Sequence, residues 1–217
     1  MKTIHKSIEL PAKSISKENY IVIDIETTGL GYKNKIIIIG LFIIEEYKTQ
    51  ATFLQFFNDD GLSEKEILFA FIENILKFKK YYFISYNGNA FDFSFINARL
   101  NFHHLNFQLS KSNNVDLLAI ARSHKSKFPF QSLNLKSIES FYSIIRKDAI
   151  SGKESIDLYN AYILDPSHRL EDLILTHNED DILNLWPLFS NMKSHLKFPL
   201  PACFIWDEQY YYIQALF

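Results

Sequence analysis

The sequence predicts an α/β fold in which a mixed central sheet starts as an antiparallel meander, continues with parallel strands and is flanked by helices. β-Branched runs at 20–27 and 35–44 are separated by a short turn, and a third run at 51–57 follows closely. A further strand-like run at 81–88 leads directly into a helical pattern at 91–100. The chain therefore combines hairpin-connected strands with the strand-turn-helix unit of a parallel sheet.

The boundaries of the first elements follow from local signals. The glycine-containing segment 29–34 predicts a hairpin turn between the first two strands. Ser63 is a predicted N-cap, and Glu66, three positions later, would complete a capping box. The helix that follows is expected to reach about residue 78, with Glu64 on its solvated side.

The later elements are less sharply defined. Residues 115–123 fit either a strand or a helix. Three segments have helical patterns: 133–145, 157–164 and 169–196, the last with Pro187 as a potential kink. The aromatic tail at 202–217 is expected either to form a strand or to pack on the core.

Composition and charge limit the class of protein. With 217 residues and 47% hydrophobic content, the chain is expected to form one domain over 1–217, with its motifs within about 20–189 and a C-terminal extension at 190–217. A net charge of −2 excludes a generally basic nucleic-acid binder. Any contact with nucleic acid is therefore expected to be local.

The sequence also bears on the compartment. Cys203 is the only cysteine, so no intrachain disulfide forms. The first 20 residues lack the apolar core of a signal peptide, and the apolar run at 35–44 is far shorter than the roughly 20 residues that span a bilayer. We therefore expect a cytoplasmic protein without a membrane segment.

Two acidic residues stand in the first predicted strand, where acidic residues are uncommon. Asp24 and Glu26 are two positions apart, so both side chains leave one face of the sheet while Ile25 points to the other. Two carboxylates on one face of an apolar strand repel each other unless a cation neutralises them. The pair predicts a metal site, and an edge strand with a solvated acidic face is the alternative.

Two later segments add further acids. Asp92 lies in the first turn of its predicted helix, where capping and the helix dipole are an equally good explanation. His177 and Asp181 are four residues apart on a predicted helix and so share one face. For the acidic run at 179–181, a solvated helix face is the alternative.

Together these residues fit the needs of a hydrolase that uses two divalent ions. Such a site needs ligands for one ion that activates water and for another that stabilises the leaving oxygen. The candidate ligands are Asp24, Glu26, Asp92 and Asp181. His177 is the candidate base, because an unperturbed imidazole accepts a proton near neutral pH. The predicted chemistry is phosphodiester hydrolysis.

The segments that carry these residues resemble those of the ribonuclease-H-like DEDD 3′-5′ exonuclease superfamily and, within it, the YprB-type family. The matching motifs are VIDIETTGL at 22–30, YNGNAFDFSFINARL at 86–100 and LTHNEDDILNLWPL at 175–188. In the wider superfamily the third motif has Tyr four residues, or His five residues, before the Asp. Here His177 stands four residues before Asp181, as it does in the YprB-type pattern.

The resemblance implies a ribonuclease-H-like fold and a 3′-5′ exonuclease that acts on single-stranded DNA or RNA ends with two Mg²⁺ or Mn²⁺ ions. It also implies that the four acids bind the metal and that His177 is the base. Candidate substrate contacts are Thr27, Thr28, Gly29, Asn87 and Arg99. For Gly29 and Asn87, turn formation is the alternative.

Two other functions are compatible with the same residues. One is a catalytically weak or inactive module that binds nucleic acid or recruits a protein partner in nucleic-acid processing. The other is a structure-specific endonuclease that uses the same metal cage.

Overall fold

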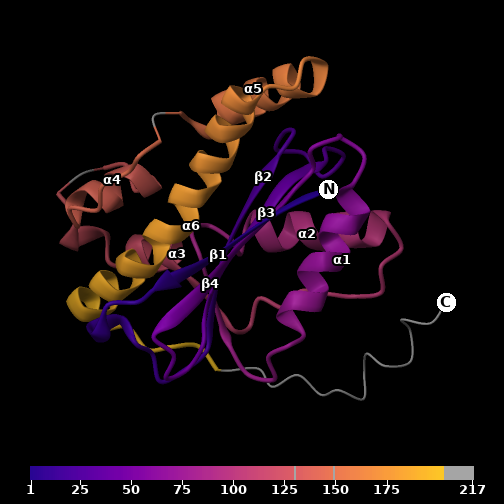
Figure 1. The fold of residues 1–217 in the computed structure, drawn as a ribbon. Coiled ribbons are helices and arrows are strands. Elements are labelled where there is room, and N and C mark those ends of the chain that lie inside the picture. The colour runs from indigo at the N-terminus through magenta and orange to yellow at the C-terminus, as the bar shows by residue number, and fades with distance from the viewer. Residues whose placement is uncertain (130, 149, 203–217) are drawn as a thin grey trace.

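The central sheet has the strand order β1-β4-β3-β2-β5-β6 (Figure 1). A computed structural model describes residues 1–129, 131–148 and 150–202. The strands are β1 (Lys2–Glu9), β2 (Tyr20–Thr27), β3 (Ile36–Ile44), β4 (Gln50–Phe57), β5 (Tyr82–Ser85) and β6 (Asn114–Asp116). In this order, each pair of neighbouring strands among β1, β4, β3 and β2 is antiparallel. Strand β5 pairs parallel with β2, and β6 pairs parallel with β5. The predicted mixed sheet and its opening meander are confirmed.

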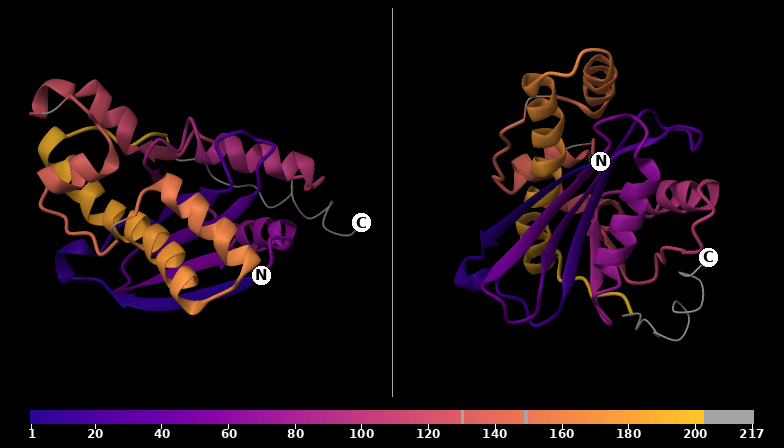
Figure 2. Two further views of the ribbon diagram at one scale, coloured as in Figure 1. Left: turned by 90° about the horizontal axis from the view of Figure 1, so that it is seen from above. Right: turned by 45° about the vertical axis from the view of Figure 1, so that its right-hand side comes forward.

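Helices cover both faces of this sheet. They are α1 (Glu64–Ile75), α2 (Asp92–Phe102), α3 (Leu117–Ser123), α4 (Leu135–Phe141), α5 (Gly152–Leu164) and α6 (His168–Leu196). Short 3-10 turns span Ala12–Ser14 and Lys125–Lys127. Helices α1 and α2 lie against one face, and the long helix α6 crosses the other with α5 beside it (Figures 1 and 2). Within the described part of the chain, no helix is both long and apolar enough to cross a membrane.

Alternation along β2 separates the two cores. Tyr20 and Val22 pack in the core that includes Trp186 of α6, whereas Ile21 and Ile23 pack in the core that includes α1. Even-numbered positions of β2 therefore face α6, because successive strand residues point to opposite faces. This alternation places the next two even positions, 24 and 26, under the same helix.

Gly40 allows α6 to approach the sheet closely at this level. It pairs with Asp24 across the β2–β3 ladder. A Cβ atom at position 40 would lie 1.9 Å from Ile182 Cδ1 and 2.4 Å from Asn178 Oδ1, both on α6. Since real Cβ atoms do not approach other atoms so closely, the glycine sets the distance between helix and sheet.

Several local predictions are corrected by the structure. Ser63 is the N-cap of α1, but its hydroxyl donates to Asp60 Oδ2 at 2.6 Å and no capping box with Glu66 forms. Glu64 is buried rather than solvated, because it pairs with a cation from α2. Residues 115–123 form the end of β6 and then all of α3, so the strand and the helix predictions are each correct for part of the segment.

The predictions for the two ends of the chain had different outcomes. The sequence did not predict β1, an exposed edge strand whose polar and apolar residues form no clear alternation. Residues 203–217, most of the aromatic tail for which a strand or core packing was predicted, lie outside the described residues.

Candidate functional site

Strand β2 contributes two carboxylates, Asp24 and Glu26, to the site. Asp24 is half-buried and Glu26 is buried on the face under α6, while Ile25 joins the core on the other face. Asn178 Nδ2 of α6 donates to Asp24 Oδ2 at 2.8 Å, and Gln55 Nε2 of β4 donates to Asn178 Oδ1 at 2.9 Å. This buried chain of amides fixes the Asp24 carboxylate. The predicted common face of the two acids is confirmed.

Asp92 reaches the same place from the carboxyl end of β5. It is buried at the start of α2, and its Oδ1 accepts a hydrogen bond from the Ile25 backbone N–H at 3.1 Å. The turn before it is held by Asp116, whose two oxygens accept from the N–H groups of Asn87 and Asn89 at 3.0 and 3.1 Å. Asn87 has φ +70°, which an asparagine tolerates better than most residues. Asp92 is therefore tied to β2 directly.

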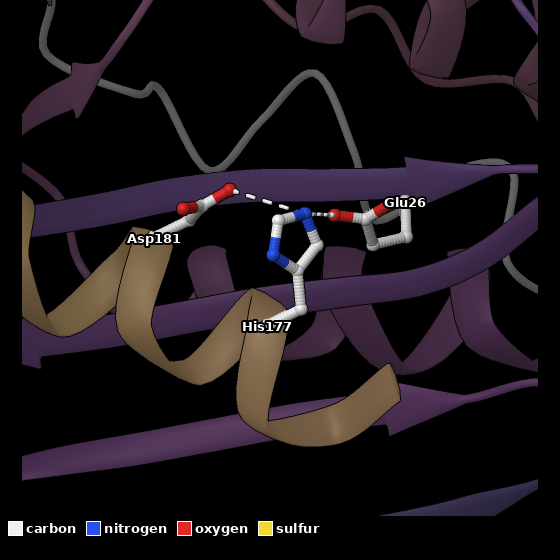
Figure 3. A group of neighbouring side chains, drawn as sticks. All are labelled: Glu26, His177 and Asp181. Atoms are coloured by element: carbon white, nitrogen blue, oxygen red, sulfur yellow. Dashed lines mark ion pairs between the residues drawn. The ribbon is translucent and has the colours of Figure 1, made fainter. Parts of the chain in front are cut away.

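Helix α6 supplies the third segment. His177 Nε2 lies 3.5 Å from Glu26 Oε1 and 3.8 Å from Asp181 Oδ2, so the imidazole stands between the two carboxyl groups (Figure 3). One ligand atom from each of Glu26, His177 and Asp181 lies within 4.8 Å of the other two. The predicted common face of His177 and Asp181 is confirmed, and their chemistry suits a divalent cation.

A loop between α4 and α5 adds two residues that sequence reasoning missed. His177 Nδ1 lies 2.6 Å from Asp148 Oδ2. Arg146 Nε donates to Asp148 Oδ1 at 2.6 Å, Nη1 donates to Glu139 Oε2 at 2.9 Å, and Nη2 contacts Asp181 Oδ1. The segment RKD at 146–148 has no periodic pattern, so nothing in the sequence distinguishes it from a solvated loop.

Asp180 of α6 binds the backbone of this loop. Its Oδ2 accepts hydrogen bonds from the backbone N–H groups of Lys147 and Asp148, at 2.5 and 2.7 Å. Glu179, by contrast, pairs with Lys6 of β1 at the margin of the sheet. The acidic run at 179–181 is therefore not a solvated face, because each of its members has a separate partner.

The site is strongly acidic, and its carboxyl groups are buried or half-buried. Burial and the charges of neighbouring carboxylates raise the pKa of Asp24 well above its usual range. Burial raises the pKa of Glu26 to about 7, although His177 opposes the shift. Burial likewise raises the pKa of Asp92 to about 7, against the stabilising hydrogen bond from Ile25. A cation bound here would stabilise the charged carboxylates and so oppose these upward pKa shifts.

The acids open into a cleft of about 960 Å³. Its walls are formed by side chains from β2, the β5–α2 turn, α4, the start of α5, the segment that joins these two helices, and α6. The lining includes Asp24, Glu26, Thr27, Leu30, Asn87, Phe91, Asp92, Lys136, Arg146, Lys153, His177 and Asp181. The four predicted metal-binding acids and His177 thus share one cavity.

The predicted substrate contacts divide into two groups. Thr27 and Asn87 line the cleft. Thr28 and Gly29 take part in the β2–β3 turn, where Thr28 Oγ1 accepts from Lys35 N–H at 3.0 Å and the Gly29 carbonyl accepts from Thr27 Oγ1 at 2.9 Å. Neither is among the residues that line the cleft.

Arg99 requires a correction. Its guanidinium is 3% exposed and is held by Glu64, with Nε to Oε1 at 2.7 Å and Nη2 to Oε2 at 2.5 Å. His103 adds a contact of 2.8 Å to the same carboxylate. Arg99 therefore joins α2 to α1 and is not among the residues that line the cleft, and its guanidinium is almost wholly buried against a carboxylate.

Comparisons with known proteins agree with this fold. Residues 21–193 match the sequence model that describes the RNase H superfamily. Among solved structures, the chain is similar to the family B DNA polymerase from the hyperthermophilic archaeon Pyrobaculum calidifontis, with a TM-score of 0.62 and 15% identity. That likeness covers 81% of this chain and only 24% of the polymerase. No curated protein has a significantly similar sequence. With the match extending from β2 almost to the end of α6, the chain belongs to the RNase H superfamily.

Proposed function

We propose that this chain is a metal-dependent nuclease, and more narrowly a 3′-5′ exonuclease that hydrolyses DNA or RNA with two divalent ions, Mg²⁺ or Mn²⁺. One observation carries the proposal. Four buried or half-buried acids from three separate segments, Asp24, Glu26, Asp92 and Asp181, converge with His177 in one cleft. Membership of the RNase H superfamily supports a nuclease reaction.

The donor set fits hard divalent cations. Carboxylate oxygens are their preferred ligands. Burial raises the pKa of Glu26 and of Asp92 to about 7, and the charge of Asp181 adds to both shifts, so a bound cation would favour the charged carboxylates. Bound ions would neutralise the transferring phosphate and activate water. The chain's own contribution is to fix Asp24 through Asn178 and Asp92 through the Ile25 N–H, so that the ligands are pre-positioned.

Two lysines in the cleft suit contacts with a phosphate backbone. Lys136 and Lys153 line the cleft and flank the start of α5. Lys136 Nζ donates to the Ile150 carbonyl at 2.6 Å and lies 3.6 Å from Asp148 Oδ2, whereas Lys153 is exposed and has no ion pair with any described residue. A strand that enters the cleft would therefore meet both these cations and the candidate metal ligands.

The direct test is digestion of matched DNA and RNA oligonucleotides in Mg²⁺ and in Mn²⁺. We expect stepwise release of mononucleotides from an end-labelled single strand, and none in the presence of a chelator. A second substrate carries a blocked 3′ end. Loss of cleavage on it supports the exonuclease, internal cleavage products identify an endonuclease, and no cleavage of any substrate in either metal contradicts the nuclease assignment.

Lys153→Ala is expected to weaken substrate binding with little effect on chemistry. Removing one phosphate contact should raise KM about three- to tenfold, change kcat less than about twofold and lower the slope of log affinity against log salt by about 0.7. Michaelis curves at several salt concentrations measure all three. Lys65→Ala, on α1 across the sheet, is the matched control. Equal behaviour of the two variants would place the substrate elsewhere.

A further inference from the structure

His177 directs Nε2 at the carboxyl groups of Glu26 and Asp181. The side chain is 5% exposed, and Nε2 makes no hydrogen bond with any residue that the structure describes. Its nearest polar atoms are Glu26 Oε1 at 3.5 Å and Asp181 Oδ2 at 3.8 Å. Two ligands bound about 2.1 Å from one ion lie about 3.0 to 4.2 Å apart. Both separations therefore fit a common ion.

Asp148 prepares the imidazole for this role. Its Oδ2 lies 2.6 Å from His177 Nδ1, so in the neutral ring Nδ1 carries the proton and Nε2 presents its lone pair to Glu26 and Asp181. A carboxylate on the far nitrogen is the usual outer partner of a histidine that binds metal. Arg146 and the Asp148 backbone N–H, which donates to Asp180, hold the carboxylate in place.

Arg146 also leaves a single oxygen of Asp181 available. Its Nη2 contacts Asp181 Oδ1, and Asp181 Oδ2 is the oxygen that faces His177. The same guanidinium also binds Asp148 and Glu139, and these contacts hold it on the Oδ1 side of Asp181. Arg146 and Asp148 therefore position one carboxylate oxygen and one imidazole nitrogen toward the same point.

We propose that His177 Nε2 is a ligand of a divalent ion, together with Glu26 and Asp181, rather than the base that deprotonates water. The inference rests on the proposed function, because it assigns a ligand within the same metal site. It also has a chemical consequence. An imidazole nitrogen suits Mn²⁺ and its transition-metal neighbours better than Mg²⁺, which prefers oxygen ligands. The site therefore selects Mn²⁺ over Mg²⁺.

The decisive measurement is pulsed EPR of the full chain loaded with Mn²⁺. We expect modulation from a directly coordinated ¹⁴N nucleus, and its replacement by a ¹⁵N pattern when only the histidines are labelled with ¹⁵N. The labelling needs no variant, so it is independent of any folding defect. Nitrogen coupling should disappear in His177→Gln and persist in His168→Gln, which changes an exposed histidine at the start of the same helix.

Metal affinities give a second readout that does not depend on turnover. In calorimetric titrations, His177→Gln should lower the preference for Mn²⁺ over Mg²⁺ about tenfold, because glutamine offers a neutral oxygen instead of nitrogen. Asp148→Asn should weaken Mn²⁺ binding about 10- to 100-fold and still show the ¹⁴N coupling, since it removes only the outer partner. Thermal unfolding of each metal-free variant verifies that it folds.

The outcomes separate this inference from the nuclease assignment. Nuclease activity with Mn²⁺ bound but without nitrogen coupling overturns the ligand role and leaves the nuclease standing. The same holds if His177→Gln keeps its metal preference, because the imidazole would then serve as a base or as a counter-cation for the two carboxylates. Nitrogen coupling in a protein that cleaves no nucleic acid supports the ligand and contradicts the nuclease.

Discussion

The double variant Asp24→Asn, Asp92→Asn is expected to lower phosphodiester turnover by at least about 10³-fold. The two residues come from β2 and from the start of α2, and both face the cleft. Each loses a negative charge but keeps an oxygen that can accept the hydrogen bonds from Asn178 and Ile25. Stabilisation of transition-state charge by bound ions is worth several kcal/mol, and about 1.4 kcal/mol corresponds to one factor of ten.

Single-turnover cleavage of a labelled oligonucleotide at saturating Mn²⁺ measures this loss. Asp172→Asn is the matched control, since Asp172 is an exposed acid on α6 outside the acid cleft. The control should retain activity within about twofold, as surface changes usually do. Activity of the double variant at the level of the control would refute the metal-dependent nuclease, because only Glu26 and Asp181 would remain of the four described acids that line the cleft.

Asp92→Asn alone is expected to stabilise the metal-free protein at pH 8. Burial raises the pKa of Asp92 from an ordinary value near 4 to about 7, so folding disfavours its charged form. A carboxyl group whose folded pKa is raised contributes full stability below its unfolded pKa, and that contribution is lost as pH rises through about 7. Removing the charge should therefore increase the free energy of unfolding at pH 8 by on the order of 2 kcal/mol.

Thermal unfolding in a chelator between pH 5 and pH 8.5 tests this expectation. The wild-type protein should lose stability as the pH passes 7, since the pKa of Glu26 is also raised to about 7 by burial. The Asp92→Asn curve should fall less, and adding Mn²⁺ should stabilise the wild type more than the variant. A variant less stable than the wild type at pH 8 without metal would show that folding does not disfavour the charged form of Asp92.

Some of the site was predictable because it depends on local periodicity. The two-residue spacing of Asp24 and Glu26 fixes a common face on any strand, and the four-residue spacing of His177 and Asp181 fixes a common face on any helix. Asp92 was expected in the first turn of its helix and begins α2. These placements need only the type of secondary structure, which the apolar patterns of the sequence indicate clearly.

Other parts of the site depend on contacts between distant segments. Gln55 and Asn178 are 123 residues apart and meet only when β4 and α6 pack on the same sheet. Arg99 was predicted to contact the substrate and Glu64 to face solvent, yet the two form a buried ion pair between α2 and α1. No sequence pattern links one partner to the other, so local reasoning assigned both of them wrongly.

The sequence by itself determined the mixed sheet, the faces of its acidic residues and the resemblance to ribonuclease-H-like exonucleases, because alternation and helical periodicity encode which side of an element is buried. Only the tertiary structure decided what surrounds His177. The loop that carries Arg146 and Asp148 has no regular period, and its carboxylate reaches Nδ1 through the packing of the loop on α6. The orientation of the His177 ring depends on contacts between segments far apart in the sequence, and a local sequence pattern does not specify such contacts.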